Sequence, residues 1–142
     1  MSQENVEVVR RVYEAVAVGD SEGVLAKYDP DVEFDFSRSP FASVLNKSVF
    51  RGHDGLRDFI RERYEALEKA EDDCQELIEV GDKVISVVTS RARGRESGVD
   101  VEQTHYALWS IDAGKVTSVR WFGTHDEALE AVGLRGVTPS DP

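Results

Sequence analysis

Apolar residues recur at spacings of three and four along the first part of the chain. The stripe consists of Val6, Val9, Tyr13, Val16 and Ala17. This period is typical of an amphipathic helix, which we predict over residues 3–18 with Gly19 ending it. Ser21 can then cap a second short helix, which Pro30 ends. The chain therefore begins with two helices that each offer one apolar face.

The apolar period changes to two after Pro30, which indicates a strand over residues 32–36. A long loop over residues 37–51, typical of a functional segment, precedes a third helix over residues 54–67. Four more strands are predicted over residues 75–80, 84–93, 99–111 and 116–122, and a last helix over residues 125–132. A single sheet that buries one face needs helices to cover it. The order predicts an α+β domain with a small-molecule cavity between sheet and helices.

Composition limits what this domain can bind. The 142 residues predict one domain over residues 1–136, with a frayed tail over residues 137–142. The net charge of −11 disfavours nucleic acid as a partner. Because we find neither a signal peptide nor an apolar run near the ~18–20 residues of a membrane span, we expect a cytoplasmic protein without a membrane partner. One cysteine, Cys74, and three scattered histidines offer no metal-ligand spacing, so we expect no metal and no cofactor.

Three stretches cover nearly the whole chain in a recognisable order. The first stretch comprises Val9 to Ala15, Gly19-Asp20 and Tyr28 to Val32. The second runs from Phe50 to Phe59. The third comprises Asp112 to Phe122 and Glu127 to Leu129. Together they resemble the nuclear-transport-factor-2-like superfamily, and within it the ketosteroid-isomerase-like and SnoaL-like groups. The resemblance implies a cystatin-like fold, in which a cone-shaped, curved antiparallel sheet wraps around the N-terminal helices. It also implies a homodimer through the sheet.

The resemblance points to Asp35 as a first candidate catalytic residue. Ketosteroid isomerases carry a general base, an aspartate, at the matching place on the first strand, where an apolar cavity would raise its pKa. The alternation of Val32, Phe34 and Phe36 argues the other way. Unless a bulge re-aims the strand, Phe36 faces the cavity and Asp35 faces water.

Tyr13 and His105 are the other two candidates. The isomerases use a tyrosine of the first helix as an oxyanion donor, although the best register places Val12 there and Tyr13 one residue later. His105 falls where they carry a second donor, an aspartate, and a histidine can exchange a proton near neutral pH. It shares a strand face with Trp109, which favours that face as the concave one. The opposite face, which includes Tyr106, stays open as the alternative and would suit a dimer contact.

Two functions from different classes are consistent with the sequence. In the first, a cofactor-free isomerase, cyclase or dehydratase transfers a proton on a small apolar carbonyl compound, with Asp35 or His105 as base and Tyr13 as donor. In the second, the domain binds a small ligand or forms a dimeric scaffold without catalysis. In either case the predicted ligand-contacting residues are Phe36, Tyr64, Trp109, Arg120, Trp121 and Phe122. Convergence of two candidate polar side chains in one cavity would separate the two functions.

Overall fold

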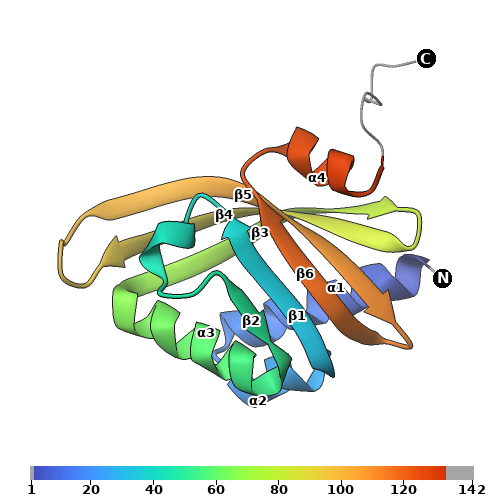
Figure 1. Ribbon diagram of the computed structural model, residues 1–142, viewed down its shortest axis with the longest axis horizontal. Helices are drawn as coiled ribbons and strands as arrows, with labels where there is room; N and C mark the ends of the chain where they lie inside the picture. The colour runs from blue at the N-terminus through green and yellow to red at the C-terminus, as the bar shows by residue number, and fades with distance from the viewer. Residues whose placement is uncertain (1, 134–142) are drawn as a thin grey trace.

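The computed structural model describes residues 2–133 of the chain (Figure 1). The helices are α1 (Ser2–Ala17), α2 (Ser21–Ala26), the short 3-10 turn η1 (Ala42–Val44), α3 (Gly52–Ala66) and α4 (His125–Ala131). The strands are β1 (Tyr28–Arg38), β2 (Val49–Arg51), β3 (Leu67–Val80), β4 (Lys83–Gly94), β5 (Asp100–Asp112) and β6 (Lys115–Phe122). The predicted tail over residues 137–142 lies outside the described residues. None of the described helices is long and apolar enough to cross a membrane.

The six strands within residues 2–133 form one sheet in the order β2-β1-β6-β5-β4-β3. Neighbouring strands are antiparallel except β1 and β6, which run parallel. The predicted α+β fold is therefore confirmed, with a mixed, mostly antiparallel sheet. The prediction of a loop over residues 37–51 was wrong at both ends, because β1 continues to Arg38 and β2 pairs Phe50 with Phe34 of β1.

Two strands begin much earlier than predicted. Pro30 does not end α2; it lies inside β1, between the paired positions Tyr28 and Glu33, where the register with β6 shifts. A proline is tolerated there because the irregular pairing does not require its missing N–H. β3 begins at Leu67, and its acidic first half hides the strand pattern. Charged residues suit this position because β3 is an edge strand with one side open to water.

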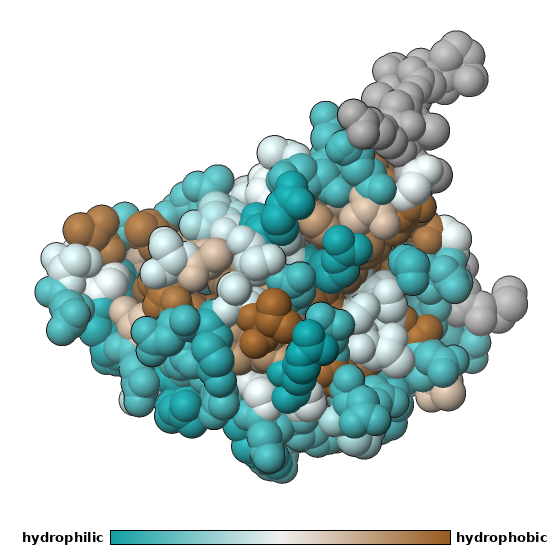
Figure 2. Space-filling view, viewed as in Figure 1, coloured by the Kyte–Doolittle hydropathy of each residue, from teal (hydrophilic) through white to brown (hydrophobic). Residues whose placement is uncertain are grey.

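The sheet separates two groups of helices (Figure 1). One face packs against α1, α2 and α3 through the main apolar core, which includes Val9, Val12, Val32 and Trp109. The other face packs against α4 through a smaller cluster of Ile85, Leu108, Phe122 and Ala128. The face seen in Figure 2 is mostly hydrophilic, and its hydrophobic side chains show only as small separate patches.

The face of β5 that we predict as a homodimer contact carries side chains already engaged within the chain. Thr104 Oγ1 lies 2.9 Å from Thr89 Oγ1, and the Tyr106 ring stacks on His125. Glu102 forms an ion pair with Arg91. The homodimer itself stays a prediction.

Candidate functional site

A cavity of about 80 Å³ lies between the concave face of the sheet, α1, α3 and the segment around η1. Its lining consists of Tyr13, Phe34, Phe36, Phe41, Val44, Leu45, Phe59, Arg63, Leu67, Asp72, Ser90, Ala92, His105 and Trp121. Most of these side chains are aromatic or aliphatic. The polar ones, including Tyr13 and His105, come from α1, α3, β3, β4 and β5. This combination of an apolar chamber with a few polar groups is typical of a small-molecule site.

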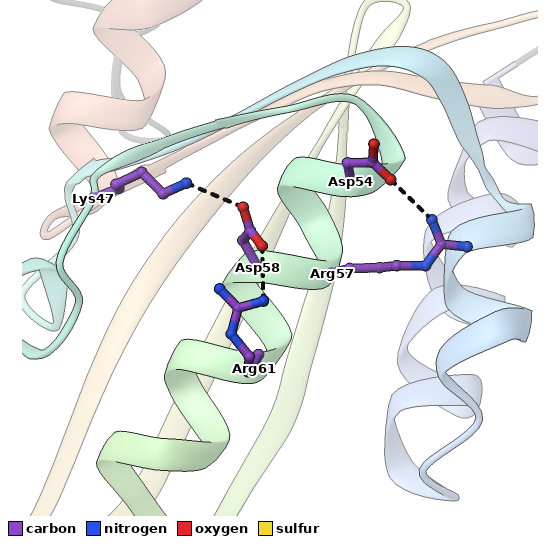
Figure 3. A network of polar contacts seen from close by, with 5 residues as sticks. All are labelled: Lys47, Asp54, Arg57, Asp58 and Arg61. Carbon is purple, nitrogen blue, oxygen red and sulfur yellow. Dashed lines mark hydrogen bonds and ion pairs between the residues drawn. The ribbon is translucent and has the colours of Figure 1, made fainter.

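The segment after β1 closes the cavity and is tied to α3 by polar contacts (Figure 3). Lys47 Nζ donates to Asp58 Oδ2 over 3.1 Å, and Asp58 also accepts from Arg61. These two hydrogen bonds lower the pKa of the Asp58 carboxyl. One residue earlier, the backbone N–H of Asn46 donates to the buried Glu62 Oε1 over 2.8 Å. The contacts hold the apolar side chains of this segment over the cavity.

A row of hydrogen bonds runs along the polar wall of the cavity. Arg63 of α3 forms a two-pronged ion pair with Asp72 of β3, with N–O distances of 2.8 and 2.9 Å. Ser90 Oγ donates to Asp72 Oδ1 over 2.7 Å and lies 2.9 Å from His105 Nε2. On the far side of the ring, His105 Nδ1 lies 3.2 Å from Ser39 Oγ. We call these five residues the Arg63–Ser39 row.

The proton positions along this row follow from its donors. Ser90 has one hydroxyl hydrogen and gives it to Asp72, so Ser90 Oγ accepts the Nε2–H of His105. In the neutral ring Nδ1 is then an acceptor, and Ser39 Oγ–H donates to it. Ser39 Oγ in turn accepts from the Phe41 N–H over 3.0 Å. Every member is satisfied when the His105 imidazole is uncharged.

The surroundings of His105 favour the same uncharged form. The residue is 3% exposed, and its ring stacks on Trp121 with centroids 4.3 Å apart. Burial lowers the pKa of His105 to about 4, although the Asp72 carboxylate acts to raise it. At neutral pH His105 is therefore a proton acceptor at Nδ1.

A second row of hydrogen bonds ends at Tyr13. Trp109 Nε1–H donates to Ser86 Oγ over 2.9 Å, and Ser86 Oγ lies 2.9 Å from Tyr13 Oη. Either hydroxyl can be the donor in this pair. When Ser86 donates to Tyr13 Oη, the Tyr13 hydrogen is free to donate to an acceptor in the cavity. Burial raises the pKa of Tyr13 well above its usual value, so the phenol stays protonated.

The structure brings Tyr13, His105, Phe36 and Trp121 together and leaves the other predicted residues outside the lining. Asp35 is not at the cavity: the alternation of β1 buries Phe34 and Phe36 at the cavity, and Asp35 Oδ1 accepts from Ser37 N and Oγ. Trp109 lies in the core behind Tyr13, with ring centroids 5.7 Å apart. It positions Tyr13 through Ser86 and does not line the cavity.

The remaining three predicted contact residues were placed on the wrong surface. Tyr64 is 71% exposed, and Arg95 stacks on its ring. Arg63, its neighbour on α3, takes the inward position that we expected for Tyr64. Arg120 is exposed on the outer face of β6, 5.4 Å from the ring of Phe122. Phe122 packs beneath α4, because the strand alternation turns Trp121 inward and both its neighbours outward.

Four members of the Arg63–Ser39 row were not predicted from the sequence. They are Ser39, Arg63, Asp72 and Ser90. Ser90 lies directly opposite Asp72 across the β3–β4 pair. With the start of β3 predicted correctly, strand alternation would have placed these two side chains on the same face as His105. This alternation was the one available signal.

Comparison with known proteins agrees with this architecture. A family model described as "SnoaL-like domain" matches residues 9–119. The structure of an NTF2-like protein of unknown function from Burkholderia pseudomallei is 24% identical, covers 94% of this chain and 98% of its own, and has a TM-score of 0.75. These findings confirm the predicted NTF2-like fold. The comparison with curated proteins found no match.

Two further structures with this fold contain small molecules. A protein from Catenulispora acidiphila with a ketosteroid isomerase-like fold, in complex with trimethylamine, is 13% identical over 94% of this chain and 98% of its own, with a TM-score of 0.69. A Mycobacterium tuberculosis protein in complex with estradiol-17β-hemisuccinate is 18% identical over 87% of this chain and 95% of its own, with a TM-score of 0.70. At these identities the likeness shows the fold alone.

Proposed function

The chain belongs to the family of SnoaL-like domains, and from this premise we propose that its cavity binds a small, largely apolar carbonyl compound and transfers a proton on it without a cofactor. The reaction class is that of an isomerase, a cyclase or a dehydratase. The small molecules bound by two proteins of the same fold support the binding step. The cavity of about 80 Å³ has about half the volume of an apolar cavity that holds benzene, so the compound is small, and a five-membered ring enters only when the lining side chains shift.

One observation carries the proposal: a hydroxyl donor and an imidazole acceptor line the same apolar cavity. Tyr13 O–H can donate to the carbonyl oxygen and stabilise the negative charge that develops there. His105 Nδ1 can take the proton from the neighbouring carbon once the Ser39 hydroxyl turns away. The imidazolium formed in this step is stabilised by the Asp72 carboxylate through Ser90. Return of the proton to another atom of the bound molecule completes the reaction.

Proton transfer can be measured without knowing the natural substrate. Deuterium uptake at the α-carbons of cyclopentanone in D₂O, followed by proton NMR, reports removal of a proton beside a carbonyl. We expect the protein to accelerate this exchange. His105→Gln and Tyr13→Phe should each lower the protein-dependent rate by about 100-fold, because each removes a group that acts in the transition state.

Matched controls come from the other side of the sheet. His125→Gln and Tyr106→Phe make the same chemical changes at residues that stack on each other outside the cavity. Both should retain the exchange rate of the unmodified protein. Binding of cyclopentanone without accelerated exchange would refute the catalytic proposal and favour a ligand-binding protein. Exchange that survives His105→Gln would exclude His105 as the base.

A further inference from the structure

A second pocket, which we call the basic pocket, opens to the surface beside the cavity. It lies where the C-terminal ends of α1 and α3 meet the start of β3, and its volume is about 400 Å³. Phe59, Arg63 and Leu67 line both the cavity and this pocket, so the two are adjacent. Small-molecule sites usually have volumes of about 300–1,000 Å³. The basic pocket therefore has room for a larger molecule than the cavity does.

The charged side chains of the basic pocket carry a net positive charge. They comprise the cations Arg63, Lys69 and Arg95 and the carboxylate of Asp20. Asp20 Oδ1 already accepts the backbone N–H of Gly23 at the start of α2. The whole chain has a net charge of −11, so this lining is opposite in sign to the protein that surrounds it. A local excess of positive charge attracts an anion.

Arg95 lines the pocket with a guanidinium that is held in place. Its Nε donates to Tyr64 O over 2.7 Å, and the guanidinium lies over the Tyr64 ring, 4.7 Å from the ring centroid. Within residues 2–133 its two Nη atoms form no hydrogen bond or ion pair. A guanidinium fixed in this way can bind both oxygens of a carboxylate at little cost in side-chain entropy.

Lys69 adopts a backbone conformation that is unfavourable for lysine. Its φ is 55°, and the register of β3 with β4 shifts between Glu68 and Glu71. Such bulges turn a side chain in a new direction, and strained residues of this kind concentrate at functional sites. Lys69 lowers the pKa of the Asp100 carboxyl, but less than Arg93 does, and it forms no ion pair within the described part of the chain. Its ammonium is therefore available to a ligand.

Arg63 retains donors although it is paired with Asp72. The pair uses one N–H from each Nη atom, and a guanidinium has five N–H groups in all. The side chain lines the basic pocket, whereas Asp72 does not. An anion in this pocket thus meets the cation of the pair without its carboxylate.

We propose that the basic pocket binds an organic carboxylate with an apolar body. The carboxylate is held by Arg95 and Lys69, and the spare N–H groups of Arg63 add to the attraction. The apolar body packs against Val16 and Ile60, which line the same pocket. This site is separate from the cavity, and the proposal does not depend on proton transfer there.

Phenylbutyrate, phenylbutanamide and phenylbutylamine test the proposal, because they share a shape and differ in charge. Titration calorimetry at neutral pH and low salt should show the carboxylate binding at least about tenfold more tightly than the amide, and the amine should bind most weakly. Added salt should weaken only the binding of the carboxylate. Equal affinities for the carboxylate and the amide would overturn the proposal.

Variants assign the binding to the basic pocket. Arg95→Gln, whose amide can still donate to Tyr64 O, should weaken phenylbutyrate binding by about tenfold. Lys69→Asn, which suits the positive φ, should weaken it by about threefold. Arg120→Gln removes an arginine that is exposed on the outer face of the sheet and should leave the affinity unchanged. An equal loss in Arg120→Gln would mean attraction to surface charge in general and would refute the site.

Reversing the charge gives a test that a misfolded variant cannot pass. Arg95→Glu should bind phenylbutylamine more tightly than phenylbutyrate, which inverts the preference of the unmodified protein. A variant that keeps the original preference would refute the role of Arg95. Deuterium exchange of cyclopentanone is measured separately, so phenylbutyrate binding without exchange would refute only the catalysis, and exchange without phenylbutyrate binding would refute only this inference.

Discussion

Acidification from about pH 7 to about pH 4 is expected to remove about 3 kcal/mol of folding free energy through His105 alone. Burial lowers the pKa of this residue from 6.5 to about 4, while in the unfolded chain it keeps its ordinary value. Below about pH 6.5 the His105 imidazole is therefore protonated in the unfolded state but not in the folded state. The free energy of unfolding falls by about 1.4 kcal/mol for each pH unit in this range. The stability is fully present above that pH and is lost as the pH falls toward 4.

Urea unfolding of the protein and of His105→Gln at several pH values isolates this contribution. Other groups titrate in both proteins, so the informative quantity is the difference between the two unfolding free energies. That difference should shrink or reverse by about 3 kcal/mol between about pH 7 and about pH 4. His125→Gln controls for the loss of an imidazole outside the cavity. A difference that stays constant over this range would mean that His105 accepts a proton in the folded state as easily as in the unfolded chain.

The parts of the fold that sequence patterns predict are those governed by local interactions. The stripe containing Val6 and Val9 locates α1, because a helix turns its side chains to one face whatever it packs against. Glycines with positive φ, such as Gly81 and Gly114, locate two hairpin turns, since other residues adopt that conformation with difficulty. The early start of β3 was not predictable in this way. Most of its residues from Glu68 to Asp73 are charged, and they form a strand because β4 pairs with them.

The polar residues of the site were predictable only where a resemblance pointed to them. Tyr13 and His105 could be proposed from their places along the chain, and both line the cavity. Arg63 and Asp72 look like solvent-exposed charges in a sequence, because nothing local reveals that α3 and the edge strand place them face to face. The prediction that Asp35 lines the cavity was wrong for the opposite reason. Its place along the chain matched, but the alternation of β1 turned it away.

Removing the Asp72 carboxylate is expected to destabilise the protein by about 2–3 kcal/mol. Asp72→Leu leaves the Arg63 guanidinium without its two-pronged partner and the Ser90 hydroxyl hydrogen without its acceptor. Loss of one member of a buried pair usually costs about 3–5 kcal/mol. We expect less because the two side chains are 26% and 16% exposed, so water stabilises part of the unpaired charge. Urea unfolding at neutral pH measures the change, and Asp100→Leu, which breaks an exposed pair with Arg93, should have little effect.

Stability and proton transfer should separate when both members of the pair are replaced. Arg63→Met combined with Asp72→Leu removes the unpaired charge, so most of the lost stability should return. The Ser90 hydrogen, no longer drawn to Asp72, can then donate to His105 Nε2 and shift the ring proton to Nδ1. His105 would lose its acceptor toward Ser39 and the cavity, so the folded double variant should exchange cyclopentanone protons as slowly as His105→Gln. A stable double variant with full exchange activity would show that Asp72 serves the fold alone.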